Sequence, residues 1–474
     1  MLRPWELRIQ VKLQDSKAVY LQIADAIITA IKQGILKPKD VLPGSRKLAE
    51  QIGVNRNTVV KAMDVLIIEG WLQTTERKGV FVADVLTDTK RNETRSAIQL
   101  VKTRKPHIPK AKICFDDGLP DSRLAPITEL ARAYRQLFDR KAKWQMMGYS
   151  EAQGDPVFRE VIVTMLNHKR GLALNSKELC VTRGSQMALF LIAHCLIEKG
   201  DTVLIENPGY KPAWDAFKNA GAELLPVPME ADGMELETVK SYLATGRRIK
   251  AIYTTPHHHF PTTVSLSLSK RLELIQLSNK HGFYIVEDDY DHEFHFGARP
   301  LLPVGSLQNI EQYVYIGTLS KIIFPALRIG YIASNESLIE KVVALRSIID
   351  VQGDNIMEQA ILQLIQDGSI RKHLNRATPY YQKKRDRFAI IVEKLLGEKV
   401  QFTKPEGGLA FWLVPKHSAD ITEIAHQALH RGVQILMPEK YSFGTPIQGM
   451  RLGYASLTEQ QLEEGISILG DLLH

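Results

Sequence analysis

The chain has 474 residues, 44% of them hydrophobic and 24% charged, which predicts two or more globular domains. No apolar run reaches the roughly 20 residues that cross a bilayer, and the start MLRPWELRIQ lacks the apolar core of a signal peptide, so we expect a cytoplasmic protein with no membrane partner. A net charge of +8 allows a nucleic-acid partner, and three cysteines without paired short spacing exclude a disulfide framework and a cysteine zinc site.

The first 84 residues predict three helices followed by a β-hairpin. Apolar residues recur at helical spacing over 19–32, as on one buried helical face. The stretch LPGSRKLAEQIGV predicts a short second helix with its turn at Gly53, and Asn55 can cap a third helix. In WLQTTERKGVFVAD, two strands flank the basic turn Arg77-Lys78-Gly79, which has the form of a wing.

Helix, helix, turn, helix and hairpin in this order form a winged helix-turn-helix, whose third helix enters the major groove of DNA. The stretch LPGSRKLAEQIGVNRNTVVKAMDVLIIEGWLQTTERKGVFV resembles the DNA-binding domain of GntR-type bacterial regulators. That family usually has serine at the position of Gly44, and the neighbouring Ser45 could take the place of that serine. The implied partner is double-stranded DNA, and the residues expected to contact it are Arg46, Asn55, Arg56, Asn57, Thr58, Lys61, Arg77, Lys78 and Gly79.

Residues 85–112 are rich in lysine and arginine and show no sustained periodicity, a composition typical of a linker. We therefore expect a DNA-binding domain at 1–84, a basic linker at 85–112 and a large domain at 113–474. The linker is either a solvated tether or a second, weaker contact to DNA phosphates.

The large region alternates short apolar strands with helices, which predicts an α/β domain with a mostly parallel sheet covered on both faces. Open sheets of this kind bind ligands at the carboxyl ends of their strands. Between one strand and its helix, the backbone N–H groups of Gly184, Ser185 and Gln186 can hold a phosphate. Tyr210 in NPGY offers an aromatic plane, and Asp288 in EDDYDHEF offers a carboxylate at another strand end.

Pyridoxal 5'-phosphate needs an amine for its aldehyde, an anion for its ring nitrogen, a flat face for its ring and donors for its phosphate. In LSKIIFPALRIGY, Lys321 lies beside the apolar Ile322 and Ile323, which favour a neutral amine able to form a Schiff base. Arg328 offers a planar fork for phosphate oxygens. The residues thus predict a pyridoxal phosphate site with Lys321 as its covalent anchor.

The region from 113 to 474 resembles a fold-type I aminotransferase, and the whole chain resembles the MocR/GabR family of pyridoxal phosphate-dependent transcriptional regulators. The resemblance implies that Asp288 pairs with the ring nitrogen, Tyr290 with the ring hydroxyl, and Arg451 with an effector carboxylate, unless Arg451 pairs with a structural carboxylate instead. Tyr149 would reach the phosphate of a neighbouring subunit, which implies a homodimer. Stacking falls to Tyr210, and phosphate binding to Thr318, Ser320 and Arg328.

The loop TPHHHFPTT departs from the aminotransferase pattern, because Phe260 stands where an asparagine usually touches the ring hydroxyl. This favours sensing over efficient turnover without excluding slow transamination. Residues His257 to His259 are not expected to bind a metal, since consecutive histidines alternate faces on an extended chain.

The sequence therefore predicts a transcriptional regulator that senses an amino-acid-like effector by aldimine exchange on pyridoxal 5'-phosphate. Two alternatives stay open. One is a working aminotransferase with a DNA-binding appendage. The other is a regulator of vitamin B6 supply that senses the cofactor itself.

Overall fold

The computed structural model describes residues 9–12, 15–75, 79–84, 111–139, 148–297, 301–307, 310–444 and 446–473. The chain divides into two compact units, residues 1–104 and 105–474, each with its own hydrophobic core. Most of the predicted linker, residues 85–110, lies outside the described ranges. The predicted domain boundaries therefore stay predictions.

The first unit contains the predicted helices and hairpin. Its elements are α1 (Val19–Lys32), α2 (Ser45–Ile52), α3 (Arg56–Ile68), β1 (Leu72–Thr75) and β2 (Gly79–Val82), with the two strands antiparallel. Gly53 ends α2 with a φ of 78°, a left-handed conformation that glycine adopts without strain, and this turns the chain toward α3. Apolar side chains of all three helices meet in one core around Leu48 and Val59. The predicted winged helix-turn-helix is confirmed.

The second unit is built on an eight-stranded sheet in the order β4-β11-β10-β9-β8-β5-β6-β7. Strands β5, β6, β8, β9 and β10 run parallel, whereas β11 is antiparallel to both its neighbours and β7 is antiparallel to β6. The predicted, mostly parallel sheet is therefore confirmed. Its strands are β4 (Leu179–Thr182), β5 (Thr202–Asn207), β6 (Glu223–Glu230), β7 (Gly233–Met234), β8 (Ile249–Thr254), β9 (Tyr284–Asp289), β10 (Tyr313–Thr318) and β11 (Gly330–Ser334).

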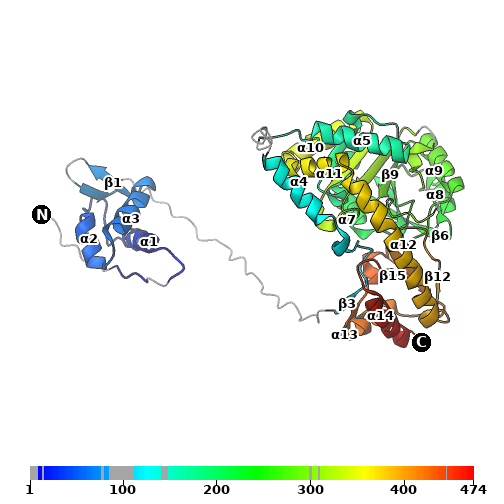
Figure 1. Ribbon diagram of the computed structural model, residues 1–474. Coiled ribbons are helices and arrows are strands. Elements are labelled where there is room, and N and C mark those ends of the chain that lie inside the picture. Colours follow the sequence, from blue (N-terminus) through cyan, green and yellow to red (C-terminus); the bar gives the residue numbers. More distant parts are fainter. Residues whose placement is uncertain are drawn as a thin grey trace. The chain divides into compact units, whose positions relative to one another are not determined.

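Helices cover both faces of this sheet (Figure 1). Successive side chains of a strand point to opposite faces, so Val203 and Ile205 pack in one core while Leu204 packs in another. The first face carries α6 (Ser185–Leu196), α7 (Lys211–Asn219) and α10 (Glu336–Ile349). The second carries α5 (Pro156–Arg170), α8 (Leu236–Ala244), α9 (Leu268–His281) and α11 (Asn355–Gln366), and α4 (Ile127–Asp139) packs against α11.

The long helix α12 (Ser369–Leu396) runs from this layered region to a smaller lobe (Figure 1). That lobe has a three-stranded sheet of β12 (Val400–Phe402), β13 (Ala410–Pro415) and β15 (Met450–Gly453), and a short parallel pair of β3 (Ile113–Cys114) and β14 (Val433–Gln434). Two further helices, α13 (Ile421–His430) and α14 (Glu459–Leu472), close its core against α12.

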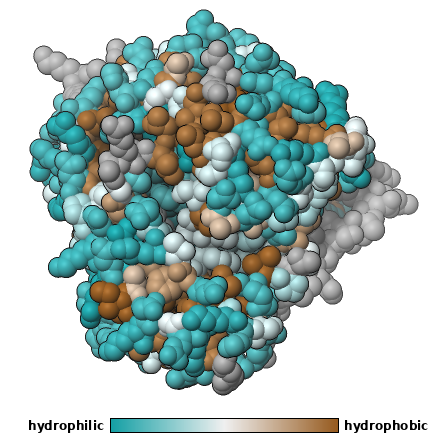
Figure 2. Space-filling model, turned by 90° about the vertical axis from the view of Figure 1, so that its right-hand side faces the viewer, coloured by the Kyte–Doolittle hydropathy of each residue, from teal (hydrophilic) through white to brown (hydrophobic). Residues whose placement is uncertain are grey.

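The surface of the molecule is mainly polar. Figure 2 shows a largely hydrophilic face on which hydrophobic residues gather in patches between the polar ones. Single exposed apolar residues are ordinary on protein surfaces, so we interpret only those that lie together. No helix within the described ranges is long and apolar enough to cross a membrane.

Candidate functional site

One cavity of about 150 Å³ lies where the central strands β8, β9 and β10 end. Its walls come from segments far apart in the sequence, because parallel strands bring their carboxyl ends to one edge of the sheet. Eight of the residues predicted for the cofactor line this cavity, namely Ser185, Tyr210, Asp288, Tyr290, Thr318, Ser320, Lys321 and Arg328.

Lys321 lies in the turn that follows β10, and its side chain is only 14% exposed. Its Nζ donates a hydrogen bond to the carbonyl oxygen of Gly118 at 2.9 Å and lies 3.5 Å from a carboxylate oxygen of Asp117. The Lys321 ammonium holds the pKa of Asp117 below its usual value. The amine is therefore directed into the cavity and held there by two oxygen atoms.

Asp288 presents a buried carboxyl group to the same cavity. It is 3% exposed, and its Oδ2 accepts a hydrogen bond of 3.0 Å from the hydroxyl of Tyr253 on β8. Its Oδ1 accepts no hydrogen bond from any described residue. Burial raises the pKa of Asp288 to about 7, against the opposing effect of the Tyr253 hydrogen bond. The free oxygen is suited to a protonated nitrogen of a ligand.

The opposite end of the cavity has the features of an anion site. Gly184 precedes α6 with a φ of 78°, and a Cβ at this position would lie 2.6 Å from the guanidinium of Arg328. That guanidinium donates to the carbonyl oxygen of Arg183 at 2.9 Å. The first N–H groups of a helix have no partner within the helix, so Ser185 and Gln186 supply backbone donors beside a cation.

Two hydroxyl groups lie between these ends. Thr318 donates to the carbonyl oxygen of Ile329 at 3.1 Å and accepts from the backbone N–H of Ser320 at 3.1 Å. The Ser320 Oγ, by contrast, has no hydrogen-bond partner among the described residues. It is a buried polar group for which a ligand oxygen would be a suitable partner.

Three further aromatic rings, those of Tyr210, Phe260 and Tyr290, line the cavity, and Arg451 contacts one of them. The ring of Tyr210 meets Phe260 edge-on, with centroids 5.3 Å apart. Tyr290 donates to the carbonyl oxygen of His258 at 2.7 Å and accepts from Arg451 at 3.3 Å.

The guanidinium of Arg451 is 1% exposed and also donates to the carbonyl oxygens of Asp117 and Pro261, at 2.9 Å each. Within the described ranges no carboxylate forms an ion pair with it, although its charge helps to lower the pKa of the nearby Asp117 carboxyl group.

Four predicted residues are not among those that line the cavity, namely Tyr149, Gly184, Gln186 and Arg451. Tyr149 is 88% exposed and does not line the pocket. The side chain of Gln186 is exposed and donates to the carbonyl oxygen of Pro212 at 3.2 Å, so only its backbone faces the anion site.

The predicted DNA-contacting residues lie mostly on one end of α3. Asn55 caps this helix, accepting from the backbone N–H of Asn57 at 2.9 Å, and Arg56 donates to the hydroxyl of Ser45 at 3.4 Å. This contact places Ser45 beside the basic end of α3. GntR-type regulators usually have their serine one position earlier in the sequence. Four of the predicted side chains are exposed, those of Arg46, Arg56, Asn57 and Lys61, and Thr58 is half-buried. Gly79 begins β2. Arg77 and Lys78 lie outside the described residues.

The three consecutive histidines contact three different carboxylates. His257 lies 3.2 Å from Asp289, and His258 lies 2.8 Å from Asp291. His259 lies 3.4 Å from Glu206. No cluster of three or more histidine, cysteine, aspartate or glutamate side chains in the described ranges could hold a metal ion.

Sequence reasoning missed Asp117, Gly118 and Tyr253. Lys321 and Gly118 are 203 positions apart, and no local motif links them. Tyr253 reads as one more apolar residue of a buried strand, although its hydroxyl group reaches Asp288. A tyrosine near the end of a central strand was the only signal that the sequence offered for it.

Comparison with known proteins gives two family matches. Residues 110–469 match the aminotransferase class I and II family, and residues 19–82 match the gntR family of bacterial regulatory proteins. The probable rhizopine catabolism regulatory protein MocR of Rhizobium meliloti is 29% identical over 95% of this chain and 93% of its own length.

Aminotransferases are also among the similar proteins. Aromatic-amino-acid aminotransferase 1 of Thermococcus litoralis is 26% identical over 81% of this chain and 92% of its own length. The crystal structure of the multiple substrate aminotransferase from Thermococcus profundus has a TM-score of 0.72 and 25% identity, and covers 76% of this chain and 91% of that one.

Proposed function

The chain belongs to the aminotransferase class I and II family and joins that domain to a GntR-type DNA-binding domain, as MocR-type transcriptional regulators do; we propose that an amino-acid-like effector of the second unit controls DNA binding by the first. The protein is a pyridoxal phosphate-dependent transcriptional regulator.

The cavity fits the cofactor of this family. Pyridoxal 5'-phosphate supplies an aldehyde that bonds covalently to primary amines and exchanges one amine for another. Lys321 would hold the aldehyde carbon, and the free oxygen of Asp288 would pair with the ring nitrogen. The phosphate would lie at the start of α6 beside Arg328, where the absence of a Cβ at Gly184 leaves room.

The observation that carries the effector proposal is the unpaired Arg451 beside Lys321. Both side chains contact the same residue, because the Lys321 amine lies near the Asp117 carboxylate and Arg451 donates to the Asp117 carbonyl oxygen. An α-amino acid presents an amine and a carboxylate a few bonds apart. Its carboxylate would pair with Arg451 while its amine replaces the Lys321 amine on the cofactor.

A homodimer is the second part of the proposal. Tyr149 is 88% exposed, and the neighbouring Ser150 donates its backbone N–H to the side chain of Gln352. Beside Gln352, at the end of α10, Ile348 and Val351 are 83% and 54% exposed. Apolar residues that gather on a surface mark an interaction site, and a second copy placed there would bring its Tyr149 toward this edge of the domain.

The test is a titration of the purified, cofactor-loaded protein with a panel of L-amino acids, followed by both visible absorption and DNA-binding anisotropy. An effector should shift the absorption band and change DNA affinity over the same concentration range. Arg451→Gln should raise the half-saturating concentration roughly tenfold or more, because the carboxylate loses a charged, bidentate partner.

Other outcomes favour the alternatives. Repeated transfer of amino groups to a keto acid at ordinary enzymatic rates, with DNA affinity unchanged, would indicate a working aminotransferase. A change in DNA affinity on adding pyridoxal phosphate alone would indicate that the cofactor itself is the signal.

A further inference from the structure

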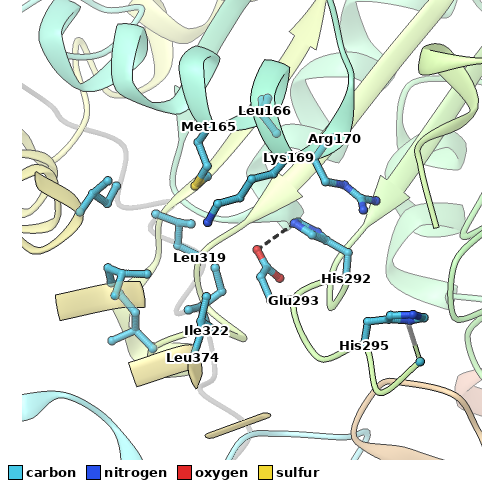
Figure 3. A pocket seen from close by; sticks show the side chains of 14 residues that line it. Met165, Leu166, Lys169, Arg170, His292, Glu293, His295, Leu319, Ile322 and Leu374 are labelled. Carbon is cyan, nitrogen blue, oxygen red and sulfur yellow. Dashed lines mark ion pairs between the residues drawn. The ribbon is translucent and has the colours of Figure 1, made fainter. Parts of the chain in front are cut away.

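A second cavity, of about 280 Å³, lies next to the segment that carries Lys321 (Figure 3). Leu319, Ile322 and Ile323, which flank the lysine, form one wall, and Ile370 and Leu374 of α12 form another. The cofactor cavity does not share these residues. The lysine segment therefore has a cavity on each side.

The alternation of side chains along β9 separates the two cavities. Asp288 faces the cofactor cavity and bonds to Tyr253. The next residue, Asp289, points to the opposite face and forms a buried ion pair of 2.6 Å with Arg170 of α5. Arg170 belongs to the wall of the second cavity. The second cavity is thus a separate space and not an extension of the first.

One end of this cavity carries a carboxylate that is short of donors. The Glu293 side chain is only 9% exposed and lies 3.0 Å from the Nε2 of His292, yet neither of its oxygens accepts a hydrogen bond of good geometry from a described residue. Burial raises the pKa of Glu293 above its usual value, and the nearby His292 offsets this effect only in part. A ligand that brings N–H donors would satisfy the group.

The same end carries an amine that lacks an anion. Lys169, in the last turn of α5, forms no ion pair with a described residue, and Figure 3 shows its side chain extending past the His292–Glu293 pair, with its amine on the side of Leu319. A simple cation would pair with Glu293 but be repelled by Lys169, and a simple anion would meet the reverse problem. A zwitterion pairs with both groups at once.

We propose that the second cavity binds an amino acid with an apolar side chain, its ammonium on Glu293, its carboxylate on Lys169, and its side chain against Leu319 and Ile322. The volume supports a ligand of this size, because it falls below the roughly 300 to 1,000 Å³ typical of pockets for drug-sized molecules. The ligand is held without a covalent bond, since the side chains that line this cavity offer no electrophile for its amine.

A ligand in this place would act on the cofactor site through shared structure. It would contact Leu319 and Ile322, on either side of Lys321 in the chain, and the first turns of α12 at the other wall. His373 of α12 already bonds to the carbonyl oxygen of Ile322 at 2.8 Å, which couples the two walls. By linkage, such a ligand and the cofactor alter each other's affinity by the same factor.

The experiment is calorimetric titration of the full-length, cofactor-loaded protein with N-methyl-L-leucine, with the visible spectrum recorded at each point. This probe is a zwitterion with an apolar side chain, but its secondary amine cannot take the place of the Lys321 amine as a primary amine does. We expect saturable binding at one site per chain while the absorption band of the cofactor stays in place. Failure of the effector proposal above would leave this result unchanged, so the two are tested separately.

Variants locate the site. Lys169→Ala and Glu293→Gln should each weaken binding roughly tenfold, the effect of losing one charge-assisted contact. Leu374→Trp should abolish binding by filling the cavity, whereas Lys372→Ala, an exposed lysine on α12, should leave affinity unchanged. Lys169 is exposed, so its removal does not endanger folding. Absence of binding at millimolar probe, or binding that Arg451→Gln abolishes and Lys169→Ala does not affect, would overturn the proposal.

Discussion

At the scale of single residues, Asp288 shows most clearly how burial prepares a side chain to bind the cofactor. Its carboxyl group has one oxygen bonded to Tyr253 and one with no partner among the described residues. Since burial raises its pKa to about 7, a cation in the cavity is needed to keep the group ionised at neutral pH. A protonated ring nitrogen meets that need.

We therefore predict that Asp288→Asn lowers the affinity for pyridoxal 5'-phosphate roughly tenfold or more, because an amide offers no charge to the ring nitrogen. Equilibrium titration followed by visible absorption measures this affinity. Asp215→Asn, an exposed position on α7, is the matched control and should bind like the unaltered protein. If both variants bound the cofactor with equal affinity, Asp288 would not be the partner of the ring nitrogen.

Sequence motifs could predict the residues that stand in a fixed order at strand ends. Lys321 and Tyr210 each follow a recognisable apolar strand, and Asp288 lies near the end of another. The cofactor's demands distinguish them from ordinary surface residues. Asp117 and Gly118 could not be found in this way. Their contact with Lys321 depends on how the smaller lobe folds back across the sheet, and nothing in the sequence around them specifies it.

At the scale of elements, the strands and helices of both units follow from periodicity. The alternation of Val203, Leu204 and Ile205 between two cores is what a sheet covered on both faces requires. The sequence does not reveal where each carboxylate of the acidic run in β9 points. The strand continues through Asp289 and places neighbouring carboxylates on opposite faces of the sheet. Only the structure shows which of them faces which cavity.

Helix α11 carries a buried carboxyl group whose titration should be visible in stability. Glu358 is 3% exposed, its Oε2 accepts from the backbone N–H of Asp155 at 2.7 Å, and burial raises its pKa from 4.5 to about 7. A carboxyl group whose pKa is raised by folding contributes most stability below pH 4.5, and loses that contribution as the pH rises to about 7.

We predict that Glu358→Gln reduces the loss of stability between pH 5 and pH 8, because the amide cannot ionise; the difference from the unaltered protein should be roughly 1 to 3 kcal/mol. Scanning calorimetry of the melting transition of the second unit at both pH values measures it. Glu340→Gln on the exposed side of α10 controls for the change in net charge. A pH dependence that Glu358→Gln leaves intact would assign the titration to another group.

At the scale of the whole molecule, the proposed homodimer would bring together two DNA-binding units. One exposed apolar cluster on the second unit, made of Tyr149, Ile348 and Val351, is where we place the contact between copies. An aspartate introduced into this contact would have its charge buried without a partner, which would destabilise the contact.

Ile348→Asp should therefore shift the protein from dimer to monomer in sedimentation velocity at micromolar concentration. Ile390→Asp, an exposed isoleucine on α12 away from that cluster, should sediment as the unaltered protein does. An Ile348→Asp protein that remains fully dimeric would place the interface elsewhere.

We propose that Lys321 anchors pyridoxal 5'-phosphate inside an aminotransferase-like domain attached to a DNA-binding domain. Borohydride reduction of the cofactor-loaded protein, followed by proteolysis and mass spectrometry, tests it directly because reduction fixes the cofactor on the amine that holds it. We predict a phosphopyridoxyl group on the peptide that contains Lys321, and none on that peptide in a Lys321→Ala protein. A label on a different lysine, or no label on a protein that is demonstrably loaded, would contradict it.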